Sequence, residues 1–356
     1  MPEPRFRSDL ETMPAYKAGA TPKAKPGVST FKISANENPY APIPAIVEAI
    51  NKAAQSVQRY PDPASLRLKT KLANKYKVGI ENIQLGTGSV AVLTQLVQAS
   101  STVGNEVIFA WRSFEAYPII TKIAGAKPVM IPLKENFEHD LDAMAKAVNE
   151  KTSCILLCSP NNPTGPAIKR KDFINFIEKI PKTVLVVLDE AYTEFVRDSE
   201  IVEGMKDAWG KPNVAILRTF SKAYGMAGLR VGFCIAQPRV IEALNKVALT
   251  FGVTNLAEEA GLAALDHEEE LLKRIDFLVQ EKNRVVRELT IKGIKIPQAD
   301  GNFIWLDLKE KSLEFAKECD AQGLSVRVFA GDGVRVTIAE EEANNRFIDI
   351  TLKFLA

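Results

Sequence analysis

Residues 184–192 read Val-Leu-Val-Val-Leu-Asp-Glu-Ala-Tyr, and this stretch says most about the fold. Its five consecutive apolar residues, three of them valine, predict a strand that is covered on both faces. Similar short apolar runs predict six more strands, and helical patterns at 66–76, 90–99 and 170–179 lie between several of them. The expected strands are 82–85, 106–110, 127–132, 153–158, 184–189, 214–218 and 231–236. This alternation predicts an α/β fold with a mostly parallel seven-stranded sheet between helices.

The pattern changes from about residue 261 onward. A long charged amphipathic helix is expected over 268–289, followed by an apolar strand from Asn302, another helix and a strand at 324–329. The first 30 residues are rich in Pro, Lys, Ala and Gly, which predicts an irregular arm. We therefore expect three parts, namely an N-terminal arm (1–30) that joins the small domain, a large domain (31–260) and a small C-terminal α+β domain (261–356).

Composition argues against several classes of protein. The 356 residues carry a net charge of only +2, so neither a nucleic acid nor a membrane surface is an expected partner. No apolar run approaches the roughly 18 residues of a membrane span, and the N-terminus lacks the apolar core of a signal peptide. The two histidines, His139 and His267, leave no multi-histidine metal site, and the four cysteines form no C-x-x-C pair. A cytoplasmic protein without a metal is expected.

Polar residues directly follow two of the expected strands, at the edge where open α/β sheets bind ligands. Asp189 ends the strand 184–189, and Ser-Pro-Asn-Asn-Pro-Thr-Gly (159–165) follows the strand 153–158. The aspartate is either a helix cap or loop anchor, or a carboxylate that pairs with a protonated pyridine nitrogen. The asparagines either belong to an ordinary turn, or an amide there donates to a ring oxygen and a substrate carboxylate.

Lys222 follows another expected strand, in a setting that is unusual for a lysine. Most lysines are solvated surface charges, but this one is flanked by Phe220 and Tyr224 between two apolar strands. A lysine must be partly desolvated, or near other cations, to form a Schiff base at neutral pH. Ser221 and Arg230 are the donor types that a phosphate dianion needs.

The sequence Gly86-Thr-Gly-Ser89 stands before the expected helix 90–99. Glycines at this position allow backbone N–H groups at a helix N-terminus to point at a phosphate. The run Gly86-x-Gly88-x-x-Ala91 also fits a dinucleotide fingerprint, so an NAD-dependent oxidoreductase is an alternative. That alternative needs an acidic residue at the end of the next strand, which instead ends in Trp111-Arg112.

Taken together, these residues resemble the fold-type I pyridoxal-phosphate (PLP) enzymes, specifically the aminotransferase class that contains histidinol-phosphate aminotransferases. The resemblance covers nearly the whole chain, and six motifs occur in family order, whereas any one of them could arise by chance. They are Asn36-Glu-Asn38-Pro39, Arg59-Tyr60-Pro-Asp, Ser159-Pro-Asn-Asn162-Pro-Thr-Gly165, Asp189-Glu-Ala-Tyr192, Ser221-Lys222 and Arg335-Val-Thr-Ile.

The resemblance implies a role for each matching residue. Lys222 would hold PLP and move the proton between the substrate Cα and the C4′ carbon, and Asp189 would pair with the pyridine nitrogen. Further implied cofactor contacts are Tyr192 and Asn162 at the ring 3′-oxygen, Phe114 on the ring face, Thr219, and Ser89, Val90, Ser221 and Arg230 at the phosphate. Tyr60 would reach the same phosphate from a partner subunit, which implies a homodimer with shared active sites. The implied substrate contacts are Arg335 for the carboxylate, with Asn162, Asn38, Tyr16 and Arg327.

Three departures from the histidinol-phosphate pattern indicate a particular branch. Val90-Ala91 replaces an Asp-Glu pair, Arg112-Ser-Phe-Glu-Ala-Tyr117 replaces a Pro-Thr-Tyr motif, and Arg335 follows Arg327 by only eight positions. These features resemble the actinobacterial aromatic amino acid (phenylalanine) aminotransferases. We therefore expect reversible amino transfer between Phe, Tyr or Trp and 2-oxoglutarate. Histidinol-phosphate aminotransferase and a PLP-dependent lyase of the same fold remain the alternatives.

Overall fold

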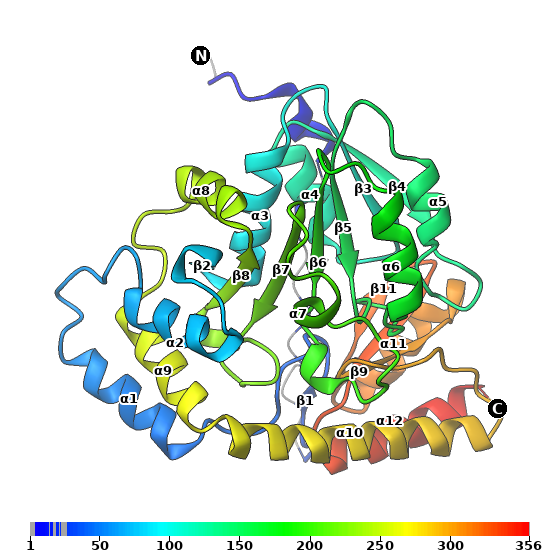
Figure 1. Cartoon of the computed structure of the whole chain (residues 1–356). Helices are drawn as coiled ribbons and strands as arrows, with labels where there is room; N and C mark the ends of the chain where they lie inside the picture. Colours follow the sequence, from blue (N-terminus) through cyan, green and yellow to red (C-terminus); the bar gives the residue numbers. More distant parts are fainter. Residues whose placement is uncertain (1–3, 14, 17–18, 21, 23–26, 356) are drawn as a thin grey trace.

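The computed structural model describes residues 4–13, 15–16, 19–20, 22 and 27–355. A seven-stranded sheet in the order β2-β8-β7-β6-β5-β3-β4 forms its centre (Figure 1). Strand β8 runs antiparallel to its neighbours, and the remaining pairs are parallel. The strands are β2 (Ile83–Gly86), β3 (Glu106–Trp111), β4 (Lys127–Pro132), β5 (Thr152–Cys158), β6 (Leu185–Asp189), β7 (Val214–Thr219) and β8 (Gly232–Ala236). The predicted α/β fold is confirmed.

Helices cover both faces of this sheet, which explains the unbroken apolar strands. Along β6, Val187 packs into one core, while Val186 and Leu188 pack into the other. The first core includes side chains of α3 (Gly88–Ser100), α4 (Ala116–Ile123) and α8 (Pro238–Val247). The second includes α5 (Leu141–Lys146) and α6 (Arg170–Lys179), with the short α7 (Gly204–Asp207) on the same side. Successive side chains of a strand point to opposite faces, so each apolar residue finds a core.

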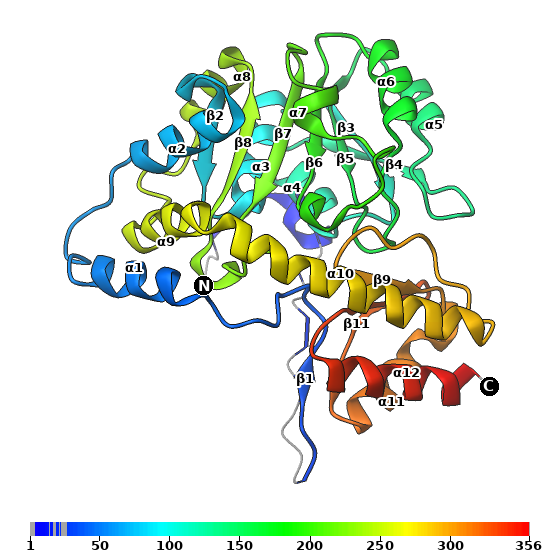
Figure 2. The same cartoon turned by 60° about the horizontal axis from the view of Figure 1, so that its bottom comes forward.

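The C-terminal part has its own antiparallel sheet, in the order β11-β12-β9. Its elements are β9 (Phe303–Leu306), α11 (Ser312–Ala321), β11 (Arg327–Phe329), β12 (Gly333–Thr337) and α12 (Glu341–Leu355). The predicted long helix is α10 (Glu268–Ile291), which runs beneath the central sheet and alongside this part (Figure 2). In addition, β1 (Phe31–Lys32) pairs in parallel with β10 (Leu324–Ser325), so residues far apart in the sequence lie side by side.

The described residues also form the α-helices α1 (Pro44–Ala54), α2 (Leu66–Tyr76) and α9 (Asn255–Asp266). Helix α9 packs against both α1 and α2. The bounds of α2 and α6 coincide with the predicted ranges, whereas α3 begins two residues before its expected start. Its first residue, Gly88, has a positive φ of 78°, a conformation that glycine adopts without strain. We propose the division into 1–30, 31–260 and 261–356 as the domain organisation, although its second boundary falls within α9.

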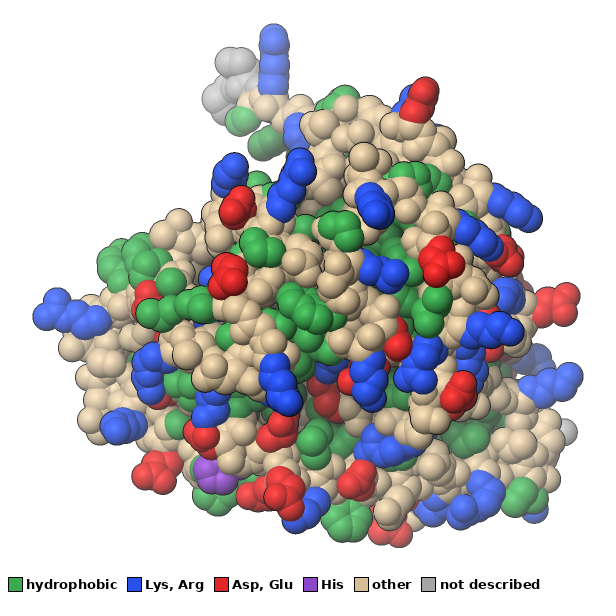
Figure 3. All heavy atoms as spheres, viewed as in Figure 1, with side chains coloured by type: hydrophobic (Ala, Val, Ile, Leu, Met, Phe, Trp, Pro, Cys, Tyr) green, Lys and Arg blue, Asp and Glu red, His purple; other side chains and the backbone are tan. Residues whose placement is uncertain are grey.

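The surface agrees with a nearly neutral chain. On the face shown in Figure 3, basic and acidic side chains are interspersed and do not gather by sign. None of the helices in the described part of the chain combines the length and the apolar character that crossing a membrane requires.

Candidate active site

A pocket of about 230 Å³ lies at the carboxyl ends of the central strands, where the C-terminal sheet meets them. Asp189 ends β6 and Thr219 ends β7, so both reach this edge directly from the sheet. All predicted site residues line the pocket except Asn38 and Tyr60. The predicted residues that line it are Tyr16, Ser89, Val90, Phe114, Asn162, Asp189, Tyr192, Thr219, Ser221, Lys222, Arg230, Arg327 and Arg335.

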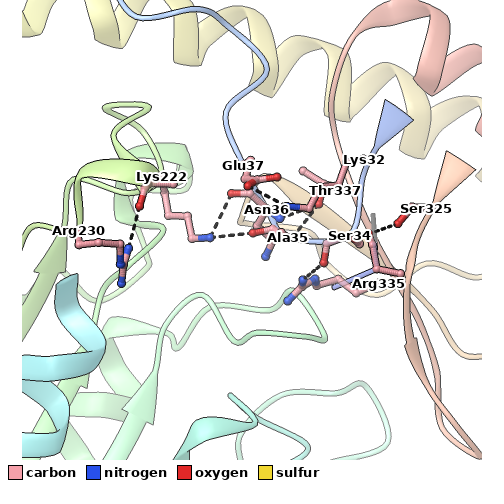
Figure 4. A network of polar contacts seen from close by, with 12 residues as sticks. Lys32, Ser34, Ala35, Asn36, Glu37, Lys222, Arg230, Ser325, Arg335 and Thr337 are labelled. Atoms are coloured by element: carbon pink, nitrogen blue, oxygen red, sulfur yellow. Dashed lines mark hydrogen bonds and ion pairs between the residues drawn. The ribbon is translucent and has the colours of Figure 1, made fainter. Parts of the chain in front are cut away.

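Lys222 presents a desolvated amine to this pocket. Its Nζ donates to the backbone oxygens of Ala35 at 3.0 Å and Asn36 at 3.2 Å (Figure 4). Burial lowers the pKa of Lys222 to about 7, and the positive charge of Arg335 acts in the same direction. A substantial fraction of this amine is therefore neutral and nucleophilic near pH 7.

Asp189 is a buried carboxylate without a cationic partner. The hydroxyl of Tyr117 donates to its Oδ2 at 3.0 Å, and the backbone N–H of Ala191 donates to Oδ1 at 3.3 Å. Within the described residues, no Lys, Arg or His side chain forms an ion pair with it. Burial raises the pKa of Asp189 to about 6. A cation brought to this carboxylate would relieve the cost of burying its charge.

Donors for an anion gather at the N-terminus of α3. Glycine permits close packing here, since a Cβ on Gly88 would lie 2.3 Å from Nη2 of Arg230. A Cβ on Gly232 would lie 2.3 Å from the backbone nitrogen of Ser89. Nη1 of Arg230 donates to the Ser221 hydroxyl at 3.3 Å. Backbone N–H groups, a hydroxyl and a guanidinium therefore converge on one corner of the pocket, as a phosphate requires.

The opposite end of the pocket holds the two arginines of the β11–β12 hairpin. Arg335 donates from Nη1 to Oδ1 of Asn162 at 2.5 Å and from Nη2 to the backbone oxygen of Ser34 at 2.6 Å. Its Nε is buried and has no partner in the described part of the chain. Burial lowers the pKa of Arg335, because the charged form loses solvation. This guanidinium therefore keeps one unused hydrogen-bond donor.

Arg327, its neighbour in the hairpin, is paired with an acid. Oε2 of Glu115 accepts from its Nε at 3.1 Å and from its Nη2 at 2.5 Å. Glu115 also lines the pocket, although it is not among the predicted site residues. Its signals in the sequence are its position directly after Phe114, the residue expected against the cofactor ring, and its place in the quoted departure 112–117.

Two more polar residues that support the site were not assigned a role from the sequence. Asn36 donates from Nδ2 to the hydroxyl of Tyr192 at 2.9 Å, and burial raises the pKa of that tyrosine. Tyr117 holds Asp189, as described above. Asn36 belongs to a quoted motif and Tyr117 to one of the quoted departures, but neither stretch indicates what its side chain contacts.

Asn38 and Tyr60 lie outside the residues that line the pocket. Asn38 donates from Nδ2 to the backbone oxygen of Ala223 at 3.1 Å and so holds the segment that carries Lys222. Tyr60 is 82% exposed, and its ring stacks on Phe251 with the centroids 4.8 Å apart. The role predicted for Tyr60 requires a second subunit and stays a prediction.

Comparison with known proteins gives this site its class. Residues 29–349 match the family model described as aminotransferase class I and II. The chain therefore belongs to the class I and II aminotransferases, a PLP-dependent family. The family and fold predicted from the sequence are confirmed, and the NAD-dependent alternative is wrong.

Individual relatives narrow the comparison. The chain is 49% identical over 351 residues to the aromatic amino acid aminotransferase of Streptomyces coelicolor, with 99% of this chain and 98% of the relative covered. It is 45% identical to the protein of the same name from Thermobifida fusca, with 98% and 96% covered. Among solved structures, histidinol-phosphate aminotransferase from Sinorhizobium meliloti in complex with pyridoxal-5′-phosphate aligns with a TM-score of 0.86 at 25% identity, covering 99% and 98%.

Proposed function

We propose that this protein catalyses reversible amino transfer between an aromatic amino acid (Phe, Tyr or Trp) and 2-oxoglutarate. The observation that carries the proposal is that one pocket combines the Lys222 amine, the unpaired Asp189 carboxylate and a group of phosphate donors. Relatives that are 41–49% identical and bear the name aromatic amino acid aminotransferase support the substrate class.

PLP fits the donors of this pocket at both of its polar ends. The uncompensated Asp189 suits a protonated pyridine nitrogen, and the glycines at 88 and 232 leave the α3 N-terminus open to a phosphate. The residues proposed to hold PLP between these ends are Phe114 on the ring face, Tyr192 and Asn162 at the 3′-oxygen, and Thr219, with Ser89, Val90, Ser221 and Arg230 at the phosphate. When bound, PLP supplies an electron sink for negative charge at the substrate Cα.

The residues of the chain would divide the work as follows. Lys222 supplies the amine that holds the cofactor aldehyde and, when free, takes a proton from the substrate Cα and returns one. Its pKa of about 7 suits both directions of that transfer at neutral pH. Asp189 keeps a proton on the ring nitrogen, since its charge favours the protonated form. Arg335 binds the α-carboxylate and so fixes the substrate Cα beside Lys222.

We also propose that the protein is a homodimer and that it is located in the cytoplasm. Tyr60 of the partner subunit would then complete the phosphate site, while Tyr16 and Arg327 would line the substrate end within one chain. Its 82% exposure leaves the Tyr60 side chain available for such a contact. Sedimentation of the purified protein tests whether it is a dimer. The PLP affinity of a Tyr60→Phe variant, compared with that of the wild type, tests the contact of Tyr60 with the phosphate.

A single-turnover experiment tests the function itself. PLP-loaded protein is mixed with phenylalanine or with histidinol phosphate, and conversion of the cofactor to its pyridoxamine form is followed by absorbance. Fast conversion with phenylalanine alone supports the proposal. Fast conversion with histidinol phosphate alone would make the protein a histidinol-phosphate aminotransferase, as in the Sinorhizobium structure. Release of ammonia and pyruvate from a suitable amino acid would indicate the lyase alternative.

A further inference from the structure

Two neighbouring arginines in the pocket are compensated in different ways. Arg327 and Arg335 are direct cross-strand partners in the β11–β12 hairpin, and they are 8% and 7% exposed. Like charges at such positions repel, and a buried guanidinium needs compensation. The hydrogen bonds of Arg335 to the described residues go to neutral oxygens, whereas Arg327 is paired with the Glu115 carboxylate.

Glu115 is placed between the cofactor end and the substrate end. It stands directly before α4, next to Phe114, and reaches across the pocket to a residue 212 positions later in the chain. Its side chain is 28% exposed and lines the pocket, so a ligand in the pocket can reach it. Glu115 therefore occupies Arg327 with a carboxylate that belongs to the chain itself.

The proposed reaction sets a problem that this ion pair can solve. One pocket has to accept an uncharged aromatic side chain in one half-reaction and the distal carboxylate of 2-oxoglutarate in the other. An apolar ring beside an unpaired Arg327 would leave a buried charge without compensation. With Glu115 in place the pair is formally neutral. The Phe329 ring, 5.6 Å from the Arg327 guanidinium carbon, already provides an aromatic surface there.

We propose that Glu115 is a specificity-determining residue that neutralises Arg327 while an aromatic substrate is bound. When a dicarboxylate binds, its distal carboxylate displaces Glu115 and takes over Arg327. This inference rests on the proposed function, because it assigns a residue to the choice between the two substrates of that reaction.

A purely structural role for the Glu115–Arg327 pair makes a different prediction, and the chain offers a matched control. Arg112, in the same loop as Glu115, forms an ion pair with Asp332 in the same hairpin as Arg327. Neither Arg112 nor Asp332 lines the active-site pocket. Asp332→Asn therefore removes a second ion pair between the same two segments without changing a side chain that lines the pocket.

The experiment measures kcat/KM for the phenylalanine half-reaction in the PLP-loaded protein and for the 2-oxoglutarate half-reaction in the same protein loaded with pyridoxamine phosphate. For Glu115→Gln we expect kcat/KM to fall about tenfold for phenylalanine and to rise about tenfold for 2-oxoglutarate. Effects of this size are typical of a charge change in a partly buried pair. Glu115→Asp should restore much of the wild-type ratio, and Asp332→Asn should leave the ratio unchanged. If Glu115→Gln lowers both values by the same factor, the pair is structural and the proposal is wrong.

A second variant keeps the proposal testable if Glu115→Gln fails to fold. In Arg327→Gln, kcat/KM for 2-oxoglutarate should fall about tenfold or more relative to kcat/KM for phenylalanine. When both variants fold, Glu115→Gln should have no further effect on the ratio in the Arg327→Gln background. A change of the same size there would also overturn the proposal. A wild-type protein without a phenylalanine half-reaction would disprove the proposed function, whereas an active wild type with an unchanged ratio in Glu115→Gln disproves only this inference.

Discussion

The two ends of the active site are built in different ways. At the cofactor end, Asp189, Thr219 and Ser89 stand at or just after strand ends of one sheet. At the substrate end, Arg335 bonds Ser34 and Asn162, which lie 301 and 173 positions away, and Arg327 bonds Glu115 across 212 positions. The cofactor end is therefore fixed by one sheet, while the substrate end depends on how the C-terminal hairpin sits against that sheet.

This difference indicates which functions each end can vary. Strand ends in a packed sheet hold side chains rigidly, and this suits groups that carry the chemistry common to a family. A hairpin and a loop that meet by side-chain contacts can change residues without disturbing the sheet. We therefore expect substitutions at the cofactor end to affect all substrates alike, and substitutions at the Glu115–Arg327 pair to affect substrates differently.

The largest expected effect is at Lys222. Lys222→Ala removes the amine that holds the cofactor and moves the proton, so kcat should fall at least about 10⁴-fold for every substrate. Steady-state assays with phenylalanine and 2-oxoglutarate measure the loss. Lys282→Met is the matched control, because Lys282 is also buried with a pKa lowered to about 8, but it donates to the backbone oxygen of Ala299 outside the pocket. Near-normal turnover in Lys222→Ala would remove this residue from the mechanism.

Asp189→Asn should have the next largest effect. The amide keeps the shape of the side chain but cannot hold a proton on the ring nitrogen, so kcat should fall about 10²- to 10³-fold, as for other key electrostatic groups. Both half-reactions should lose the same factor. A loss confined to one substrate would contradict the distinction between the two ends.

The same substitution should stabilise the cofactor-free protein in a pH-dependent way. The folded state holds the proton of Asp189 up to about pH 6, whereas the unfolded state releases it near the ordinary value of 3.8. The free energy of unfolding of the wild type should therefore fall as pH rises from about 4 to about 6. Urea titrations should show Asp189→Asn gaining about 3 kcal/mol over the wild type across that window, at 1.36 kcal/mol per pK unit. An equal difference between the two proteins at pH 4 and pH 7 would exclude this carboxylate as the cause.

Arg335→Lys should weaken the substrate end without changing the choice of substrate. A lysine lacks the planar fork that binds a carboxylate through two donors, so kcat/KM should fall about ten- to a hundredfold. Phenylalanine and 2-oxoglutarate both carry the carboxylate that Arg335 is proposed to bind, so kcat/KM should fall by the same factor for both. The two half-reactions, measured separately with the PLP-loaded and the pyridoxamine-loaded protein, give the ratio of the two kcat/KM values. This ratio should stay at the wild-type value, in contrast to Glu115→Gln.

The sequence predicted the cofactor end of the site better than the substrate end. Lys222 and Asp189 were predicted because they lie at or just beyond the carboxyl ends of apolar strands and match motifs of the family. The bounds of α2 and α6 were predicted because their apolar positions repeat with the helical period. Glu115 received no role, because its partner Arg327 is reached only through the packing of the hairpin, which local patterns do not encode. The same holds for Ser34, whose backbone oxygen contacts Arg335.

Tyr117 gives the smallest and most specific test of the cofactor end. Its hydroxyl donates to Asp189, and this hydrogen bond favours the charged carboxylate. Tyr117→Phe keeps the buried ring and removes only the hydroxyl, so kcat should fall about fivefold, the effect of one hydrogen bond of about 1 kcal/mol. A positioning role also predicts that the acidic limb of the pH–rate profile moves to higher pH, because Asp189 then holds its proton more tightly. Fluorescence-detected unfolding controls for lost packing. A fivefold loss with an unmoved acidic limb would mean that Tyr117 supports the fold and does not tune Asp189.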